Sequence, residues 1–153
     1  MKKLFIITTF VFAFGMIFQT AIGQETSGGK VANYAAGKMG QSNYEHFSFW
    51  TNEGKRSKIT YAYGKNGKGY ELEFLEAKTI QGREGFEVKF PNNLILFVIP
   101  TGNNLRVINP RGSYNKIFKW KNGSSADGSD EPCSACVENE TEAMILIKNG
   151  FLN

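Results

Sequence analysis

The sequence has few of the residues that carry metal and covalent cofactor chemistry. Its 153 residues include one histidine, His46, and two cysteines, Cys133 and Cys136. A structural zinc site usually takes four ligands, which these three side chains do not supply. Covalent haem attachment needs a histidine directly after the second cysteine, and Val137 occupies that position. The sequence therefore predicts neither a bound metal nor a cofactor.

The sequence also lacks the motifs of common hydrolases and nucleotide-binding enzymes. No G-x-S-x-G nucleophile turn occurs, and no glycine cluster forms a phosphate-cradling loop before a helix. We interpret His46 as a strand residue with a satisfied hydrogen bond. Glu71, Glu73 and Glu87 fall on the polar faces of alternating strands, which favours a solvated surface over a paired-carboxylate site. These patterns favour a protein without enzymatic activity.

Long apolar runs are confined to the N-terminus. Residues 4–18 are almost continuously apolar, follow Lys2 and Lys3, and precede the small-residue pattern at residues 21–23. This is the layout of a signal peptide, predicted to span residues 1–23 and to be cleaved after Gly23. A retained membrane anchor is the alternative, although the run is shorter than the roughly 20 residues of a membrane-spanning helix. We expect a secreted or periplasmic bacterial protein, without a transmembrane span in the mature chain and in an oxidising compartment.

The mature chain divides into four regions by composition. Residues 24–43 are rich in Gly, Ala and Ser and are predicted to be flexible, with at most one short strand around residues 31–35. Residues 44–121 form a β-rich domain, and residues 122–131 form a polar linker that buries little apolar surface. Residues 132–153 are predicted to form a C-terminal helix that carries the C-x-x-C pair.

The β-rich region shows the two-residue periodicity of strands. Residues 70–74 and 86–90 alternate apolar with charged side chains, so each segment has one buried and one wet face. Residues 94–99 are apolar on both faces and are expected to form the best-covered strand. Turn signals such as Asn66-Gly67 separate seven such strands at intervals of about ten residues. This pattern predicts an antiparallel meander forming a small closed or half-open barrel, with a β-sandwich as the alternative.

Two interpretations compete for the cysteine pair. If the helix begins near Pro132, Cys133 and Cys136 lie in its first turn, where the amide dipoles lower a thiol pKa and favour redox chemistry. The acidic side chains of Asp130 and Glu131 would raise that pKa again. We favour a structural disulfide, which by chain entropy contributes about 2 kcal/mol for so small a loop.

The positive charge is concentrated in the β-rich half of the chain. Residues 30–121 hold 15 Lys and Arg against 7 Asp and Glu, whereas residues 122–153 hold one Lys against six acids. The candidate polyanion-binding residues are Lys55, Arg56, Lys58, Lys116 and Lys119. Their expected partners are an anionic glycan, a lipid headgroup or another exported protein rather than cytosolic nucleic acid. Alternatively, the lysines protect sheet edges and keep the surface soluble, or the acidic tail folds back onto the basic core.

Taken together, these features predict an exported, non-enzymatic, β-rich binding or interaction protein, and they do not specify its ligand. A thiol–disulfide redox protein that uses Cys133 and Cys136 is the alternative function.

Overall fold

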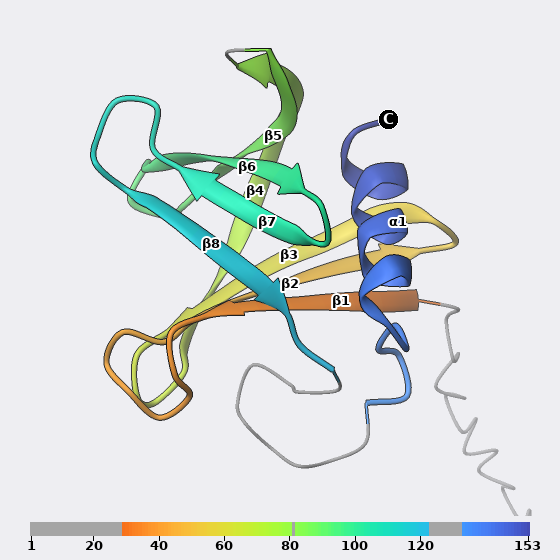
Figure 1. The fold of residues 1–153 in the computed structure, drawn as a ribbon, viewed down its shortest axis with the longest axis horizontal. Coiled ribbons are helices and arrows are strands. Elements are labelled where there is room, and N and C mark those ends of the chain that lie inside the picture. The colour runs from red at the N-terminus through yellow and green to blue at the C-terminus, as the bar shows by residue number, and fades with distance from the viewer. Residues whose placement is uncertain (1–28, 81, 123–132) are drawn as a thin grey trace, which may run out of the picture.

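A computed structural model describes residues 29–80, 82–122 and 133–153 of the chain. Over these residues, eight antiparallel strands close into a barrel in which every strand pairs with the next one in sequence (Figure 1). The last strand returns to the first, with Tyr34 opposite Trp120. The strands are β1 (Gly29–Ala36), β2 (Glu45–Asn52), β3 (Lys55–Tyr63), β4 (Lys68–Ile80), β5 (Arg83–Lys89), β6 (Ile95–Thr101), β7 (Asn104–Ile108) and β8 (Asn115–Trp120). The predicted barrel is thus confirmed in its closed form.

The barrel wall begins earlier than the sequence pattern indicates. Residues 29–36, within the segment predicted to be flexible, form β1, so the barrel starts ahead of Tyr44. Residues 31–35 are all buried, inward and outward side chains alike. A strand covered on both faces lacks the polar–apolar alternation that marks a half-buried strand. The predicted signal peptide lies outside the described residues, as does the predicted linker apart from Asn122.

A helix closes one end of the barrel. Helix α1 (Glu140–Phe151) places the Phe151 ring 5.5 Å from Phe49 and 5.3 Å from Phe86, measured between ring centroids. Phe74 lies 6.1 Å from the same ring. Phe49, Phe86 and Phe151 belong to one buried cluster that runs from the barrel interior onto the helix, and the partly buried Phe74 packs against it. Burying large aromatic side chains is strongly stabilising, so α1 acts as a hydrophobic plug.

The helix begins later than predicted, and the cysteines precede it. Asn139 caps the helix by accepting a hydrogen bond from the Glu142 N–H at 2.9 Å. The prediction that Cys133 and Cys136 lie in the first helical turn is therefore wrong, because the Asn139 cap fixes the start at Glu140. Among the described residues, no helix has the length and apolar character needed to span a membrane.

A short segment joins the helix to the edge of β1. We call residues 133–137 the strap. The Val31 N–H donates to the Ala135 carbonyl at 2.9 Å, and the Val137 N–H donates to the Val31 carbonyl at 3.0 Å. These bonds continue the edge of β1 beyond its pairing with β8, since the Lys121 N–H already donates to the Asn33 carbonyl.

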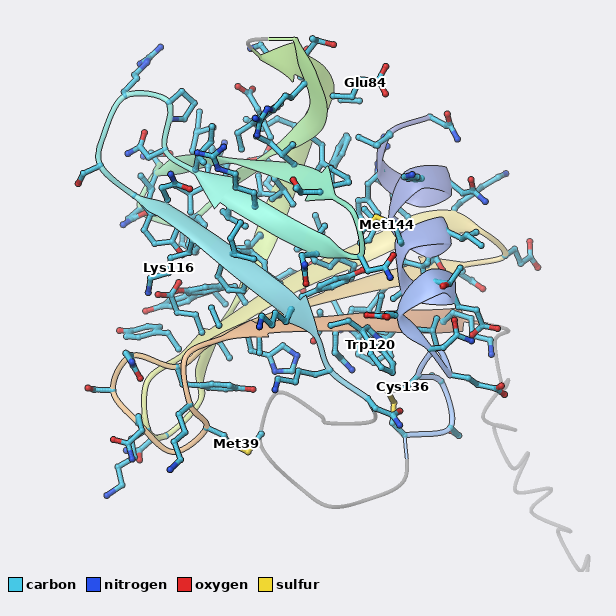
Figure 2. The ribbon with its side chains drawn as sticks, viewed as in Figure 1. Met39, Glu84, Lys116, Trp120, Cys136 and Met144 are labelled. Carbon is cyan, nitrogen blue, oxygen red and sulfur yellow. A yellow bond between two sulfur atoms is a disulfide. The ribbon has the colours of Figure 1, made fainter. Side chains whose placement is uncertain are left out.

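The up-and-down order sends alternate loops to opposite ends of the barrel. Residues 37–44, 64–67, 90–94 and 109–114 follow the odd-numbered strands and gather at one end, which we call the loop end (Figure 1). The other end, which we call the helix end, carries α1. Figure 2 shows Met39 and Lys116 toward the loop end, while Met144 lies on the helix.

Candidate functional site

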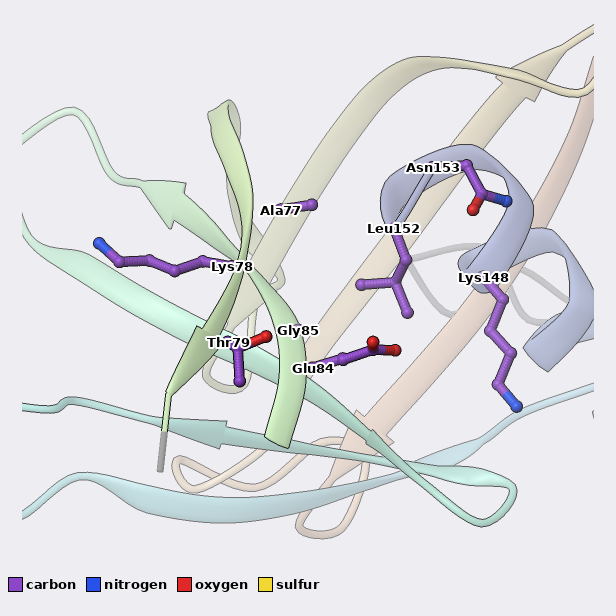
Figure 3. A pocket seen from close by; sticks show the side chains of 8 residues that line it. All are labelled: Ala77, Lys78, Thr79, Glu84, Gly85, Lys148, Leu152 and Asn153. Atoms are coloured by element: carbon purple, nitrogen blue, oxygen red, sulfur yellow. The ribbon is translucent and has the colours of Figure 1, made fainter. Parts of the chain in front are cut away.

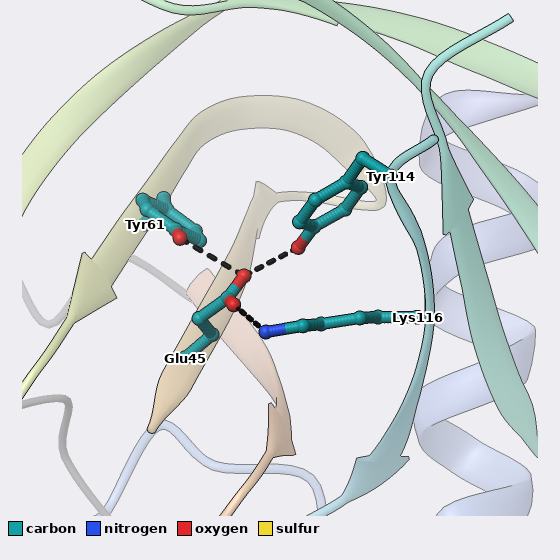
Figure 4. A network of polar contacts seen from close by, with 4 residues as sticks. All are labelled: Glu45, Tyr61, Tyr114 and Lys116. Atoms are coloured by element: carbon teal, nitrogen blue, oxygen red, sulfur yellow. Dashed lines mark hydrogen bonds and ion pairs between the residues drawn. The ribbon is translucent and has the colours of Figure 1, made fainter. Parts of the chain in front are cut away.

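A polar network occupies the barrel interior near the loop end. Glu45, at the start of β2, is only 8% exposed, and its side chain faces inward with Phe47 and Phe49. Its Oε2 accepts hydrogen bonds from the hydroxyls of Tyr61, at 3.0 Å, and Tyr114 (Figure 4). Its Oε1 forms an ion pair with the Lys116 amine. Residues from β2, β3, β8 and the loop before β8 therefore converge on one carboxylate.

The electrostatics of this network keep its hydroxyls protonated. Burial, followed by the charge and hydrogen bond of Glu45, raises the pKa of Tyr61. Burial, followed by the hydrogen bond and charge of Glu45, does the same to the pKa of Tyr114. Both tyrosines thus stay hydrogen-bond donors, and both carboxylate oxygens are engaged. Such an arrangement positions side chains and is poorly suited to proton abstraction.

Aromatic rings extend from this network toward solvent. The Tyr61 and Tyr63 rings lie 6.2 Å apart with an interplanar angle of 22°, and Tyr63 and Tyr70 lie 6.1 Å apart at 6°. Phe90 packs edge-on against Tyr61 at 5.0 Å. Tyr63 is 40% exposed, while Phe90 is buried. The loop end therefore offers near-parallel tyrosine rings that are held from below by packed side chains.

The predicted disulfide between Cys133 and Cys136 is present in the strap. The Asn33 Nδ2 donates a hydrogen bond to the Cys136 Sγ at 3.3 Å. The Asn33 Oδ1 lies 3.2 Å from the Nε2 of His46. Tyr44 Oη is 3.1 Å from the His46 Nδ1, so both ring nitrogens have partners. His46 is fully buried in the wall, as the interpretation of a satisfied strand histidine requires, and burial lowers its pKa to about 4.

The structure does not bring the five predicted polyanion-binding residues together. Lys55, Arg56 and Lys58 lie in the first half of β3, which pairs with β2 and β4 and not with β8. The Arg56 guanidinium lies 3.9 Å above the Phe74 ring, and the Lys58 amine lies 5.2 Å from the Trp50 ring. Lys116 stands opposite Val107 of the interior cluster and binds Glu45, whereas Lys119 is exposed.

A cleft of about 540 Å³ separates the β4–β5 hairpin from the end of α1 (Figure 3). Glu84 and Lys148 line it with Leu152. Lys78 points away from the helix in this view, and its amine donates to Glu87 at 3.2 Å. The charged side chains do not converge on one point of the cleft, so it is a weaker candidate site than the loop end.

Sequence reasoning missed Glu45 as a site residue. Tyr114 and Phe118 alternate with Lys116 in a pattern that suits stacking on sugars or bases, but the sequence does not place Tyr114 beside Glu45. One signal was present: Glu45 is a charged residue that shares the inward-facing alternation of Phe47 and Phe49 in β2. Tyr114 is 69 residues away in sequence, so only barrel closure reveals the contact.

The remaining observations leave the loop end as the candidate site. Within residues 29–80, 82–122 and 133–153, no three of His, Cys, Asp and Glu gather closely enough to hold a metal ion. No family model, curated protein or solved structure matches the chain. The proposal of a function therefore rests on the geometry of this barrel and on the sequence itself.

Proposed function

We propose that this is an exported, non-enzymatic binding protein that holds a saccharide at the loop end of its barrel. The observation that carries the proposal is the set of near-parallel tyrosine rings beside a fully engaged carboxylate. The leader-like composition of residues 1–23 supports export.

Tyrosine suits a site that alternates between water and ligand. Its ring offers a flat apolar face and its hydroxyl remains hydrated or hydrogen-bonded. A sugar presents the complementary surfaces, with apolar C–H faces and hydroxyls around the rim. Glu45 ties the hydroxyls of Tyr61 and Tyr114 to β2, which fixes both rings before a ligand arrives. Such pre-organisation lowers the entropy lost on binding.

The proposal is tested by titrating the mature protein with a panel of neutral and acidic oligosaccharides by calorimetry. Tyr63→Ala removes the exposed ring, and we expect the dissociation constant to rise at least about tenfold, in the range of one lost stacking contact. Ile117→Ala is the matched control, because Ile117 is 46% exposed on the outer face of β8. Equal affinities of the wild type and Tyr63→Ala would place the ligand elsewhere.

Export has its own test. The N-terminal sequence of protein recovered outside the cytoplasm should begin at Gln24. Recovery of an unprocessed chain in the cytosol would contradict this part of the proposal.

Thiol–disulfide exchange is a second candidate function. The observation in its favour is the amide of Asn33, which donates to the Cys136 Sγ and would stabilise a thiolate formed there. In such an exchange a partner thiolate attacks the disulfide to form a mixed disulfide, and a second thiol of that partner resolves it, so the partner ends as a disulfide and Cys133 and Cys136 are reduced. The reduced pair then reduces a substrate disulfide by the same steps in reverse. Turnover in an insulin-reduction assay, lost in Cys133→Ser, would favour this function over a structural staple.

A further inference from the structure

The loop end carries positive charge without nearby acids in its loops. Lys38, Lys65 and Arg111 are exposed, and each follows an odd-numbered strand. The four loops of this end, residues 37–44, 64–67, 90–94 and 109–114, contain no Asp or Glu. Carboxylates of the neighbouring strands are paired with other lysines: Glu45 binds Lys116, and Glu87, which lines a cleft together with Arg111, binds Lys78. The three exposed cations, which we call the basic rim, are therefore left uncompensated by the loops of this end.

The same loops are rich in amides and hydroxyls. Asn66, Asn92 and Asn109 lie in three different loops of the loop end. The Asn92 Oδ1 accepts from the Leu94 N–H at 3.1 Å, and the Asn109 Oδ1 accepts from the Arg111 N–H at 2.9 Å. Such side-chain turns fix the backbone of short loops. Backbone turns fix the other two rim loops, since the Gln41 N–H donates to the Lys38 carbonyl at 3.1 Å and the Gly67 N–H to the Gly64 carbonyl at 3.4 Å. The basic rim is thus carried by polar loops at the same end of the barrel as the tyrosine rings.

We infer that the saccharide bound at the loop end is an anionic glycan, with sulfate or carboxylate groups held by Lys38, Lys65 and Arg111. This inference rests on the proposed function and specifies its ligand class. The tyrosine rings contact the sugar faces, and the rim cations pair with the charged substituents. Because the cations are spread over three loops, they match a chain of several charged units rather than one isolated anion.

A membrane surface is the competing occupant for a basic, partly apolar end. Met39 and Leu94 are exposed there, at 49% and 39%. Membrane-surface binding relies on apolar residues entering the acyl boundary. The amide-bearing loop tips oppose this, because burying an amide without hydrogen-bond partners costs free energy. A hydrated glycan leaves these amides in water or bonded to hydroxyls, so the loop composition favours the glycan.

The test uses heparin oligosaccharides as the probe and the mature chain as the binding protein. The rim variant Lys38→Gln/Lys65→Gln/Arg111→Gln removes three charges from the loop end. The control variant Lys55→Gln/Lys58→Gln/Lys119→Gln removes the same three charges from exposed positions elsewhere on the barrel. Both have the same net charge, so a difference between them reports position. Circular dichroism verifies that both retain the β fold.

We expect the rim variant to bind heparin at least about tenfold more weakly. The slope of the logarithm of its binding constant against the logarithm of the salt concentration should fall in magnitude by about 2, because three ion pairs with the polyanion are lost. The control variant should stay within about threefold of the wild type, as screened surface charges predict. Equal weakening in both variants would show that only net charge matters and would overturn the inference.

Two further arms separate the sources of binding and the two levels of the proposal. The protein should bind vesicles that contain anionic lipid more weakly than heparin of equal charge. Tighter binding to the vesicles would show that the loop end binds a membrane surface and not a glycan. Tight binding of a neutral oligosaccharide that depends on Tyr63 but not on the rim would overturn the anionic class and keep the proposed function. Heparin binding that depends on the rim but not on Tyr63 would overturn the tyrosine platform of the proposed function.

Discussion

Acidification should destabilise the protein through His46, the only histidine in the chain. Its ring nitrogens contact Tyr44 Oη at 3.1 Å, Asn33 Oδ1 at 3.2 Å and Ser48 Oγ at 3.3 Å. All three partners are uncharged, since burial also raises the pKa of Tyr44. Nothing in this set compensates a positive ring, and burial lowers the His46 pKa from 6.5 to about 4. The imidazole is therefore neutral in the folded protein over the physiological pH range.

The sign and size of the effect follow from the two pKa values. Below pH 6.5 His46 is protonated in the unfolded chain, whereas in the folded protein it stays neutral until the pH reaches about 4. The stability that depends on the neutral, buried ring is therefore fully present above the unfolded pKa of 6.5, falls as the pH drops below it, and is almost fully lost once the pH reaches the folded pKa of about 4. From these pKa values the loss is about 2 kcal/mol near pH 5 and about 3 kcal/mol near pH 4.

Urea unfolding of the wild type and of His46→Asn, between about pH 7.5 and about pH 4, measures this loss. Carboxylates titrate in both proteins, so the difference between their pH profiles isolates the histidine. The wild type should lose about 2–3 kcal/mol more than the variant over this range. The single histidine also allows direct titration of its imidazole signals by NMR. A measured pKa near 6.5, or parallel profiles for the two proteins, would refute the account of a desolvated ring.

Three further predictions concern the plug, the polar network and the strap. Phe151→Ala should lower the free energy of unfolding by about 3–5 kcal/mol in urea, whereas Ile145→Ala, at a position 52% exposed, should change it by less than about 0.5 kcal/mol. Glu45→Gln leaves an ammonium without its carboxylate partner and should cost about 1–3 kcal/mol by calorimetry; an unchanged melting temperature would argue against the network. Cys133→Ser/Cys136→Ser should lower the free energy of unfolding by about 2 kcal/mol and leave the β-type circular-dichroism spectrum unchanged. The wild type in the presence of a reductant should show the same stability as this variant.

The sequence predicts the strands correctly wherever one face of the strand is exposed to solvent. β4 and β5 alternate apolar with charged residues, and Gly67 and Gly102 have positive φ in turns where Asn-Gly and Gly-Asn signals predict them. The expectation that residues 94–99 form the best-covered strand holds only in part: residues 96–99 are buried, but Leu94 and Ile95 are 39% and 40% exposed, and β1 is buried over residues 31–35. β1 was predicted as at most one short strand in a flexible segment, because a strand that is buried on both faces lacks the two-residue alternation of polar and apolar side chains. The start of α1 was predicted too early, although Asn139 followed three residues later by Glu142 is a capping pattern that marks it.

The candidate site was much less accessible, because its residues meet only through barrel closure. Glu45 and Lys116 are 71 residues apart, and no local pattern links them. Lys55 and Lys58 were chosen as candidate polyanion-binding residues because they lie close together in the sequence. In the structure they lie in the first half of β3, away from the loop end. Clustering along the chain is a poor guide in a meander, since adjacent residues of one strand face opposite sides of the wall.

The barrel architecture gives a better way to predict which residues of the chain become neighbours. In an up-and-down barrel the loops after odd-numbered strands share one end, so their residues become neighbours although roughly 25 positions separate them. Applied here, the rule collects Lys38, Lys65 and Arg111 at one end and leaves Glu53 and the Phe151 plug at the other. The helix end thus carries a hydrophobic seal while the loop end keeps exposed cations, which contribute little to folding. Charge removed from the rim should therefore leave stability within about 0.5 kcal/mol of the wild type, while substitutions in the plug unfold the barrel before they change what the loop end binds.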